Sequence, residues 1–244
     1  FDEKIALIAS FILTFSSYHI LMTLTELDVA MMFFVLLSSY FLVKYLKDNK
    51  LKYHIIATIL LGIGILMKNI AILFVPAYLV VIILYPKIKN KERIFSKKSI
   101  KTLMLFIVIM VIIALPTLVF NYILYQEKGI TDIQFSRFLS IESRGIYQSI
   151  AHTAQPFNLK TLFDDYGNGT PGIIQGIKYY WDYSIFLLIT FLIGIPIALK
   201  RDKKWAIYLL ILFIIPFLFL SGTSLLDKHF VFGVSIFCIF SSLT

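Results

Sequence analysis

The 244-residue chain is poor in cysteine and in charge. Its single cysteine, Cys238, lies within an apolar stretch, so the sequence holds neither an intrachain disulfide framework nor a cysteine cluster that could bind a metal. Only 15% of the residues are charged, against about 25% in a typical globular domain. The sequence also lacks a phosphate-binding glycine loop, a zinc-type HExxH motif and a nucleophile elbow. These absences argue against nucleotide hydrolysis.

Apolar residues dominate the composition. They make up 59% of the chain, and the mean hydropathy is +0.86, whereas globular domains contain roughly 45–50% apolar residues. A soluble core of this size could not bury so much apolar surface, but a lipid bilayer can. Lipid cannot pair loose backbone groups, so the membrane segments must be helices. The composition therefore predicts an integral membrane protein.

Eight apolar stretches are candidates for membrane-spanning helices, which need about 20 apolar residues each. They cover approximately residues 5–24, 28–46, 54–68, 70–86, 102–124, 183–199, 204–221 and 229–244. The third and fourth are separated only by Met67-Lys68-Asn69, which fits either two short spans or one broken helix. The predicted fold class is all-α, a polytopic transmembrane helix bundle of about eight membrane segments with one long extracytoplasmic segment.

The basic residues indicate how the segments are oriented. The formal net charge is +9, but the charges stand in short runs between apolar stretches, which is typical of membrane topology and not of nucleic-acid binding. If the segments alternate, 16 of the 23 basic residues fall on one side, which the positive-inside rule makes cytoplasmic. The opposite side keeps seven: Lys68, Lys128, Arg137, Arg144, Lys160, Lys178 and Lys228.

This topology predicts three regions. Residues 1–124 form transmembrane helices 1–5, residues 125–182 form an extracytoplasmic segment, and residues 183–244 form helices 6–8. Within the middle segment, the Gly/Asn/Pro cluster at 166–172 indicates turns, and the aromatic run at 179–183 indicates an interfacial belt where the chain re-enters the bilayer. The chain begins at Phe1 and ends within an apolar run, which predicts a piece of a longer protein.

Glu26 and Asp28 stand where the first apolar stretch ends and the second begins. A charge at bilayer depth costs roughly 2.5–3.5 kcal/mol, so these carboxylates must be solvated, paired or used. One explanation is a solvated helix start with Asp28 as a capping residue. The other is a carboxylate facing a polar cavity, where it could hold a sugar hydroxyl, a cation or a proton.

Two basic sites on the predicted external side have a similar pair of explanations. Gly62 and Gly64 precede Lys68, which stands between apolar runs; close helix packing with a snorkelling lysine explains this pattern, and so does a cation aimed at a lipid phosphate. Asp227-Lys228-His229 opens the last stretch, either as a surface ion pair or as basic groups at the headgroup level.

Three local patterns resemble the GT-C membrane glycosyltransferases, in the branch of dolichyl-phosphate-mannose–protein mannosyltransferases and aminoarabinose transferases. The first is Thr23-Leu24-Thr25-Glu26-Leu27-Asp28, followed by Met32-Phe33-Phe34 and Tyr40 before a basic turn. The second is Leu61-Gly62-Ile63-Gly64 running into Met67-Lys68 and an apolar helix with Pro76. The third is Asp227-Lys228-His229-Phe230. Their order and spacing cover most of the chain.

This resemblance implies a polyprenyl-phosphate sugar donor, inversion at the anomeric carbon and an acidic base in the first external loop, which would lie upstream of Phe1. The chain lacks that loop. The resemblance also implies that Asp28, Lys68 and Lys228 line the donor cavity. Asp28 and Glu26 are the carboxylates nearest membrane level, and they are the predicted catalytic residues. The predicted donor-phosphate ligands are Lys68, Lys228, His229, Arg137 and Arg144. No cofactor is established: no metal-ligand cluster is visible in the sequence, and relatives differ in metal dependence, which leaves a divalent metal open.

The predicted function is transfer of a sugar from a polyprenyl-phosphate donor to an acceptor protein, lipid or glycan. It would take place on the extracytoplasmic side of the plasma membrane, in a multi-pass protein of the cell envelope, with lipid as a partner and no nucleic acid. Two alternatives stay open. A transporter or lipid-linked sugar flippase uses intramembrane charges and broken helices equally well. A membrane scaffold would also be a hydrophobic bundle, but it has no need of a long external segment with Arg, His and Glu.

Overall fold

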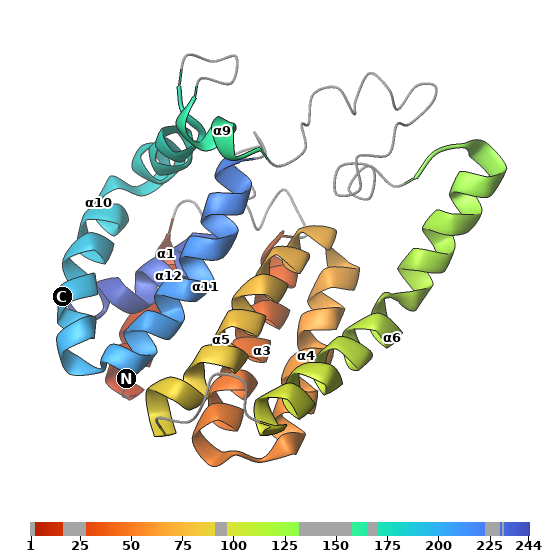
Figure 1. Cartoon of the computed structure of the whole chain (residues 1–244). Helices are drawn as coiled ribbons and strands as arrows, with labels where there is room; N and C mark the ends of the chain where they lie inside the picture. The colour runs from red at the N-terminus through yellow and green to blue at the C-terminus, as the bar shows by residue number, and fades with distance from the viewer. Residues whose placement is uncertain are drawn as a thin grey trace. The chain divides into compact units, whose positions relative to one another are not determined.

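The computed structural model describes residues 3–16, 28–90, 97–131, 158–164, 170–222, 230 and 232–244. These residues are almost entirely helical (Figure 1). Their elements are α1 (Glu3–Phe15), α3 (Asp28–Asp48), α4 (Leu51–Met67), the 3-10 helix η1 (Asn69–Leu73), α5 (Phe74–Asn90), α6 (Lys97–Lys128), α9 (Leu159–Phe163), α10 (Gly172–Arg201), α11 (Lys203–Ser221) and α12 (Phe232–Ser241). The predicted fold class, an all-α membrane helix bundle, is confirmed.

Within the described part of the chain, four helices are long and apolar enough to cross a membrane. They are Val29–Asp48, Ser99–Lys128, Ser184–Arg201 and Lys203–Ser221, and three shorter apolar helices cover Leu51–Met67, Ile70–Leu84 and Phe232–Ser241. Each matches one of the predicted stretches. Within the first predicted stretch, 5–24, helix α1 ends at Phe15, and residues 17–24 lie outside the described residues.

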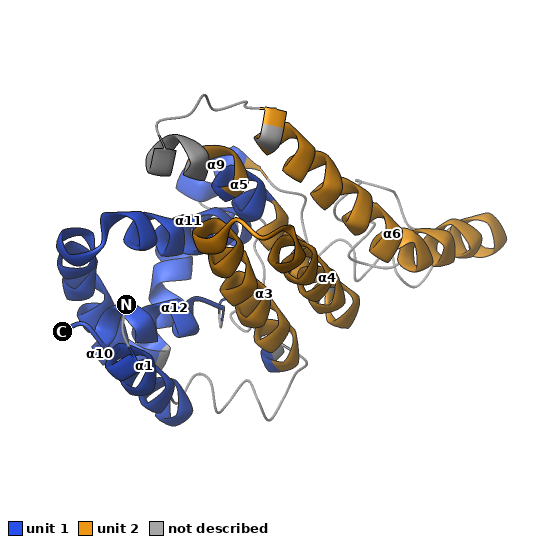
Figure 2. Cartoon of the chain, turned by 90° about the horizontal axis from the view of Figure 1, so that it is seen from below, with its two compact units in different colours: residues 1–29, 76–81, 159–244 blue, residues 30–75, 82–158 orange. Residues whose placement is uncertain are grey.

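The chain divides into two compact units, coloured separately in Figure 2. Unit 1 contains Phe1–Val29, Pro76–Val81 and Leu159–Thr244, and unit 2 contains Ala30–Val75 and Ile82–Asn158. The division into residues 1–124, 125–182 and 183–244 stays a prediction.

The core of unit 2 is formed by α3, α4 and the first half of α6. Two residues separate α3 from α4, and Asn49 closes this turn with a φ of 57°, a left-handed conformation that asparagine tolerates. Ser38 of α3 donates a hydrogen bond to the carbonyl of Ala57 in α4. On the other side of α4, Gly62 approaches Ile113 of α6 so closely that a Cβ would lie 2.6 Å from the Ile113 Cδ1. The glycine thus permits close packing between α4 and α6.

The second half of α6 leaves this packing. Pro116 lies inside the helix, and beyond it Leu118, Phe120 and Tyr122 are exposed. Figure 1 shows α6 moving away from α4 along this half. A helix of 32 residues is about 48 Å long, which exceeds the hydrocarbon thickness of roughly 30 Å. Its apolar surface is therefore available to lipid over most of its length.

Unit 1 packs α10, α11 and α12 around a cluster of aromatic rings, and α1 lies against α12. Asp202 separates α10 from α11, and its carboxylate accepts a hydrogen bond from the backbone N–H of Trp205, which caps the start of α11. Within α10, Ser184 departs from helical geometry (φ −166°, ψ 70°). This kink separates the apolar span Ser184–Arg201 from the preceding helical turns, which contain the predicted aromatic belt.

Candidate functional site

Lys68 stands at a break in the backbone of unit 2. It ends α4 in an extended conformation (φ −153°, ψ 119°), and η1 begins at the next residue. Its N–H donates to the Gly64 carbonyl at 3.0 Å, and its carbonyl accepts from the Ala71 N–H at 3.0 Å. The side chain is partly exposed. Both of its backbone groups are therefore paired although the helix is interrupted, and the stretch 54–86 forms separate helices on the two sides of Lys68.

The beginning of α3 and the end of α4 lie at the same end of this helix pair. A Cβ added to Gly64 would lie 3.6 Å from the carbonyl oxygen of Met31 and 3.5 Å from the Phe34 Cβ, so the two backbones approach closely here. Met31 is one turn from Asp28, the first residue of α3, and Gly64 is one turn from Lys68. The main chain of Asp28 is described, but its side chain is not.

In unit 1, Tyr180 fixes the backbone that follows the Asp227-Lys228-His229 motif. Its hydroxyl donates a hydrogen bond of 2.6 Å to the carbonyl of Phe230, the residue immediately after His229. Both side chains are only 2% exposed. Burial raises the pKa of the Tyr180 phenol well above its usual value, and a hydrogen bond from the Gly233 backbone opposes this. The phenol therefore stays protonated and can donate to Phe230.

Glycines make room for this contact. A Cβ on Gly233 would overlap the Tyr180 hydroxyl, and a Cβ on Gly176 would lie 2.9 Å from the rings of Phe217 and Phe230. The Tyr180 ring packs against Phe237 with 4.6 Å between ring centroids. The position of Phe230 is thus fixed by both a hydrogen bond and the shape of its surroundings.

The remaining predicted site residues lie outside the described residues: Glu26, Arg137, Arg144, Lys228 and His229. Their roles, and the predicted convergence of Asp28, Lys68 and Lys228 on one lipid phosphate, stay predictions. Among the residues that the structure describes, no group of three His, Cys, Asp or Glu side chains could hold a metal ion.

The site predicted from the sequence did not include a buried polar network in unit 2. His54 is fully buried, and its Nε2 lies 3.1 Å from the carbonyl of Thr102. The Thr102 hydroxyl in turn lies 2.9 Å from the hydroxyl of Tyr45, which joins α3, α4 and α6. The second ring nitrogen of His54, Nδ1, has no hydrogen-bond partner in the structure. The sequence signal was weak, because a single histidine near the start of an apolar helix fits many surroundings.

Comparison with known proteins finds a family match over the N-terminal part of the chain. Residues 1–120 match the family model described as dolichyl-phosphate-mannose-protein mannosyltransferase. No curated protein and no solved structure matches the chain. The matched region contains two of the three patterns that carried the resemblance, at 23–40 and 61–76. Over these residues the chain is similar to the dolichyl-phosphate-mannose–protein mannosyltransferase family, which supports a membrane glycosyltransferase of the GT-C type.

Proposed function

We propose that the chain is part of an enzyme that moves a sugar from a polyprenyl-phosphate donor to a protein, lipid or glycan acceptor on the non-cytoplasmic face of the plasma membrane. The observation that carries the proposal is the family match over residues 1–120, because it contains both the Glu26-Asp28 pattern and the Gly62–Lys68 pattern. The match favours an enzyme over the transporter and the scaffold.

The chemistry of such a transfer needs few groups. The leaving group is a phosphate, which departs as a stable monoester and needs little acid catalysis. Cations near the phosphate stabilise the charge that develops on it, and a carboxylate takes the proton of the acceptor hydroxyl. We assign the cationic role to Lys68, assisted by Lys228, His229, Arg137 and Arg144, and the carboxylate role to Asp28 and Glu26.

The position of Lys68 supports this assignment. Lys68 stands at a break between two apolar helices, which places a positively charged residue between two membrane segments. The start of α3, with Asp28, lies at the same end of the helix pair as this break. The proposed reaction requires at least one carboxylate and one cation, and the sequence offers Asp28 and Lys68 for these roles.

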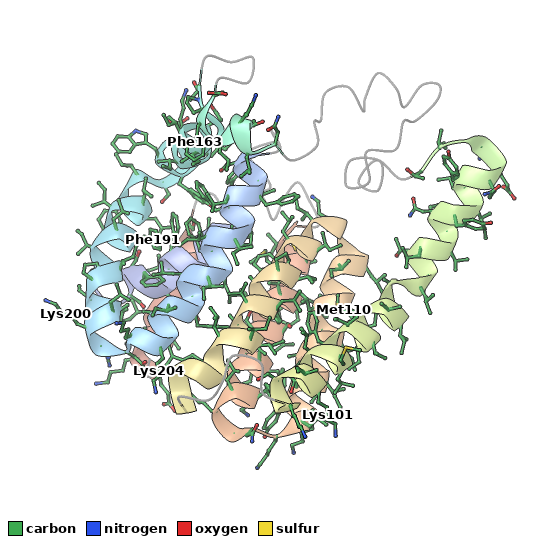
Figure 3. The ribbon with its side chains drawn as sticks, viewed as in Figure 1. Lys101, Met110, Phe163, Phe191, Lys200 and Lys204 are labelled. Carbon is green, nitrogen blue, oxygen red and sulfur yellow. The ribbon has the colours of Figure 1, made fainter. Side chains whose placement is uncertain are left out.

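The distribution of basic residues supports the proposed face. In unit 2, lysines gather at the end where α3 stops and α4 and α6 start, which is the end opposite Lys68. In unit 1, Lys200, Arg201, Lys203 and Lys204 flank the turn between α10 and α11, and Lys200 and Lys204 are labelled in Figure 3. Tyr180 lies further toward the start of α10, before the apolar span Ser184–Arg201. By the positive-inside rule, this distribution supports a non-cytoplasmic position for the Lys68 end of unit 2.

The test is Lys68→Ala in the full-length protein, assayed with a polyprenyl-phosphate sugar donor. Removing one charge-stabilising donor typically costs about 100- to 1,000-fold in rate, so we expect kcat/KM to fall at least 100-fold. Lys68→Arg should recover part of the activity because it restores the positive charge. The matched control is Lys178→Ala, an exposed lysine outside the proposed site, which should leave turnover unchanged.

Two results would contradict the proposal at different levels. Normal turnover of Lys68→Ala would remove Lys68 from the site. Uptake of a solute by proteoliposomes of the full-length protein, without any sugar transfer, would replace the enzyme with a transporter.

A further inference from the structure

Six lysines with described side chains gather at one end of unit 2. We name them the lysine rim: Lys44, Lys47, Lys50, Lys52, Lys97 and Lys101. All are exposed except Lys44, which is half-buried, and Asp48 is the acidic residue among them with a described side chain. Lys101 is labelled in Figure 3, at the start of α6. The rim therefore carries a large local excess of positive charge.

The buried network beneath the rim holds its three helix ends together. Tyr45 at the end of α3 and His54 at the start of α4 both contact Thr102 at the start of α6, at 2.9 and 3.1 Å. Each buried residue has a rim lysine close to it in sequence: Lys44 precedes Tyr45, Lys101 precedes Thr102, and Lys52 lies two residues before His54. The lysines from the three helices thus belong to a single patch.

Local contacts order part of the rim. The Asn49 N–H donates to the Tyr45 carbonyl at 2.8 Å, and the Tyr53 N–H donates to the Lys50 carbonyl at 3.0 Å, so the turn between α3 and α4 is hydrogen-bonded. The Lys44 ammonium lies 5.2 Å from the centre of the Tyr40 ring and 5.4 Å from that of Tyr53. Tyrosine rings beside lysines are typical of the headgroup level of a membrane.

Exposed apolar side chains stand directly beside the lysines. Leu51 follows Lys50 and is 46% exposed, Ile100 precedes Lys101 and is 46% exposed, and Met104 is 55% exposed one turn further along α6. An acidic soluble polymer would pair with the ammonium groups but leave these side chains in water. A ligand with a phosphate and attached acyl chains complements both groups at once.

We propose that the lysine rim binds the headgroups of anionic phospholipids, with Leu51, Ile100 and Met104 against their acyl chains. Each lysine near an anionic membrane surface adds to the attraction, so several acting on the same headgroups give a marked preference over zwitterionic lipid. The proposal is independent of the sugar-transfer reaction, because no rim lysine takes part in the proposed site.

The experiment is a titration of the purified full-length protein in mixed micelles containing phosphatidylglycerol or phosphatidylcholine, with bound lipid counted by native mass spectrometry. We expect preferential retention of phosphatidylglycerol, and at least a tenfold loss of that affinity in the triple variant Lys47→Gln, Lys50→Gln, Lys52→Gln. Raising the salt concentration from 0.05 to 0.5 M should also weaken the binding of phosphatidylglycerol to the wild-type protein, because salt screens the lysine charges. The Tm in phosphatidylcholine micelles checks that the variant is folded.

The matched control is Lys128→Gln, Lys160→Gln, Lys178→Gln, which removes the same charge at exposed lysines that are not members of the rim. It should retain wild-type affinity for phosphatidylglycerol. Equal losses in the two triple variants would mean that only net charge matters, and would overturn the proposal. Displacement of phosphatidylglycerol by polyglutamate or by inorganic phosphate at equal charge concentration would also overturn it, since the rim would then recognise anions without regard to the acyl chain.

Discussion

The apolar helices of the two units are packed through different kinds of side chain. Unit 1 fills its interior with rings: Phe191 stacks on Phe237 with 3.9 Å between centroids, and Phe237 and Phe240 are almost completely buried. Unit 2 uses small and polar groups, with Gly62 and Gly64 at helix contacts and the His54–Thr102–Tyr45 network joining three helices. Aromatic rings therefore fill the interior of unit 1, whereas a buried hydrogen-bonded network joins the helices of unit 2.

Two glycines, one in each unit, differ in the room that they leave for a side chain. A Cβ added to Gly194 of α10 would overlap the backbone carbonyl oxygen of Phe240 and lie 2.7 Å from the carbonyl carbon. A Cβ added to Gly64 of α4 would make ordinary van der Waals contacts of 3.5 and 3.6 Å with α3. Backbone atoms cannot rotate away as side-chain atoms can, so the first glycine is indispensable to its helix contact and the second is not.

The largest expected effect is that of Gly194→Ala. The added methyl group must push α12 away from α10, and overpacking of this kind costs about 3 kcal/mol. In a chain of this size that lowers the Tm by roughly 6–12 °C, which thermal unfolding of the full-length protein in one detergent would measure.

The matched substitution Gly64→Ala is the control for this prediction. It has room for its methyl group, and alanine is about 1 kcal/mol better than glycine inside a helix, so the Tm should stay the same or rise slightly. If both substitutions destabilise the protein equally, the contrast in packing between the units is wrong.

A smaller effect is expected for Tyr180→Phe in unit 1. The substitution keeps the ring within its aromatic surroundings but removes the donor to the Phe230 carbonyl, and an unpaired buried acceptor costs about 1–3 kcal/mol. Thermal unfolding checks this value. Tyr179→Phe, at the neighbouring and less buried position, should change the free energy of unfolding by less than about 0.5 kcal/mol. Equal effects of the two substitutions would mean that the Phe230 contact contributes nothing specific.

Hydropathy predicted most of the helices, because a membrane helix is specified by the length of its apolar run. The break at Met67-Lys68-Asn69 was also visible in the sequence, since a lysine and an asparagine interrupt an otherwise apolar stretch. The start of α10 could not be predicted from the sequence. Gly172 belongs to a predicted turn cluster, yet it begins a helix that continues through the aromatic run to a kink at Ser184. Aromatic residues suit a membrane interface and a buried core equally, so composition could not distinguish the two.

The contacts within the site region could not be predicted from the sequence, for a related reason. Tyr180 and Phe230 are 50 positions apart, and Tyr45 and Thr102 are 57 apart. Membrane helices look alike around their circumference, so their apolar pattern does not say which face meets which neighbour. The sequence could therefore mark Lys68 and Asp28 as unusual, but it could not identify Tyr180 or His54 as residues that hold helices together.

The smallest effect is expected for Tyr45→Phe in unit 2. It removes the hydrogen bond to the Thr102 hydroxyl, but this hydroxyl can turn to the carbonyl one turn back in α6, so no acceptor is stranded. Hydrogen bonds between membrane helices are worth about 0.6 kcal/mol on average, and the free energy of unfolding should fall by that amount. Thr102→Val alone should lower the free energy of unfolding by about as much as the double substitution with Tyr45→Phe, because both substitutions remove the same hydrogen bond. A loss for Tyr45→Phe as large as that for Tyr180→Phe would show that hydrogen bonds in unit 2 are as critical as the buried contact in unit 1.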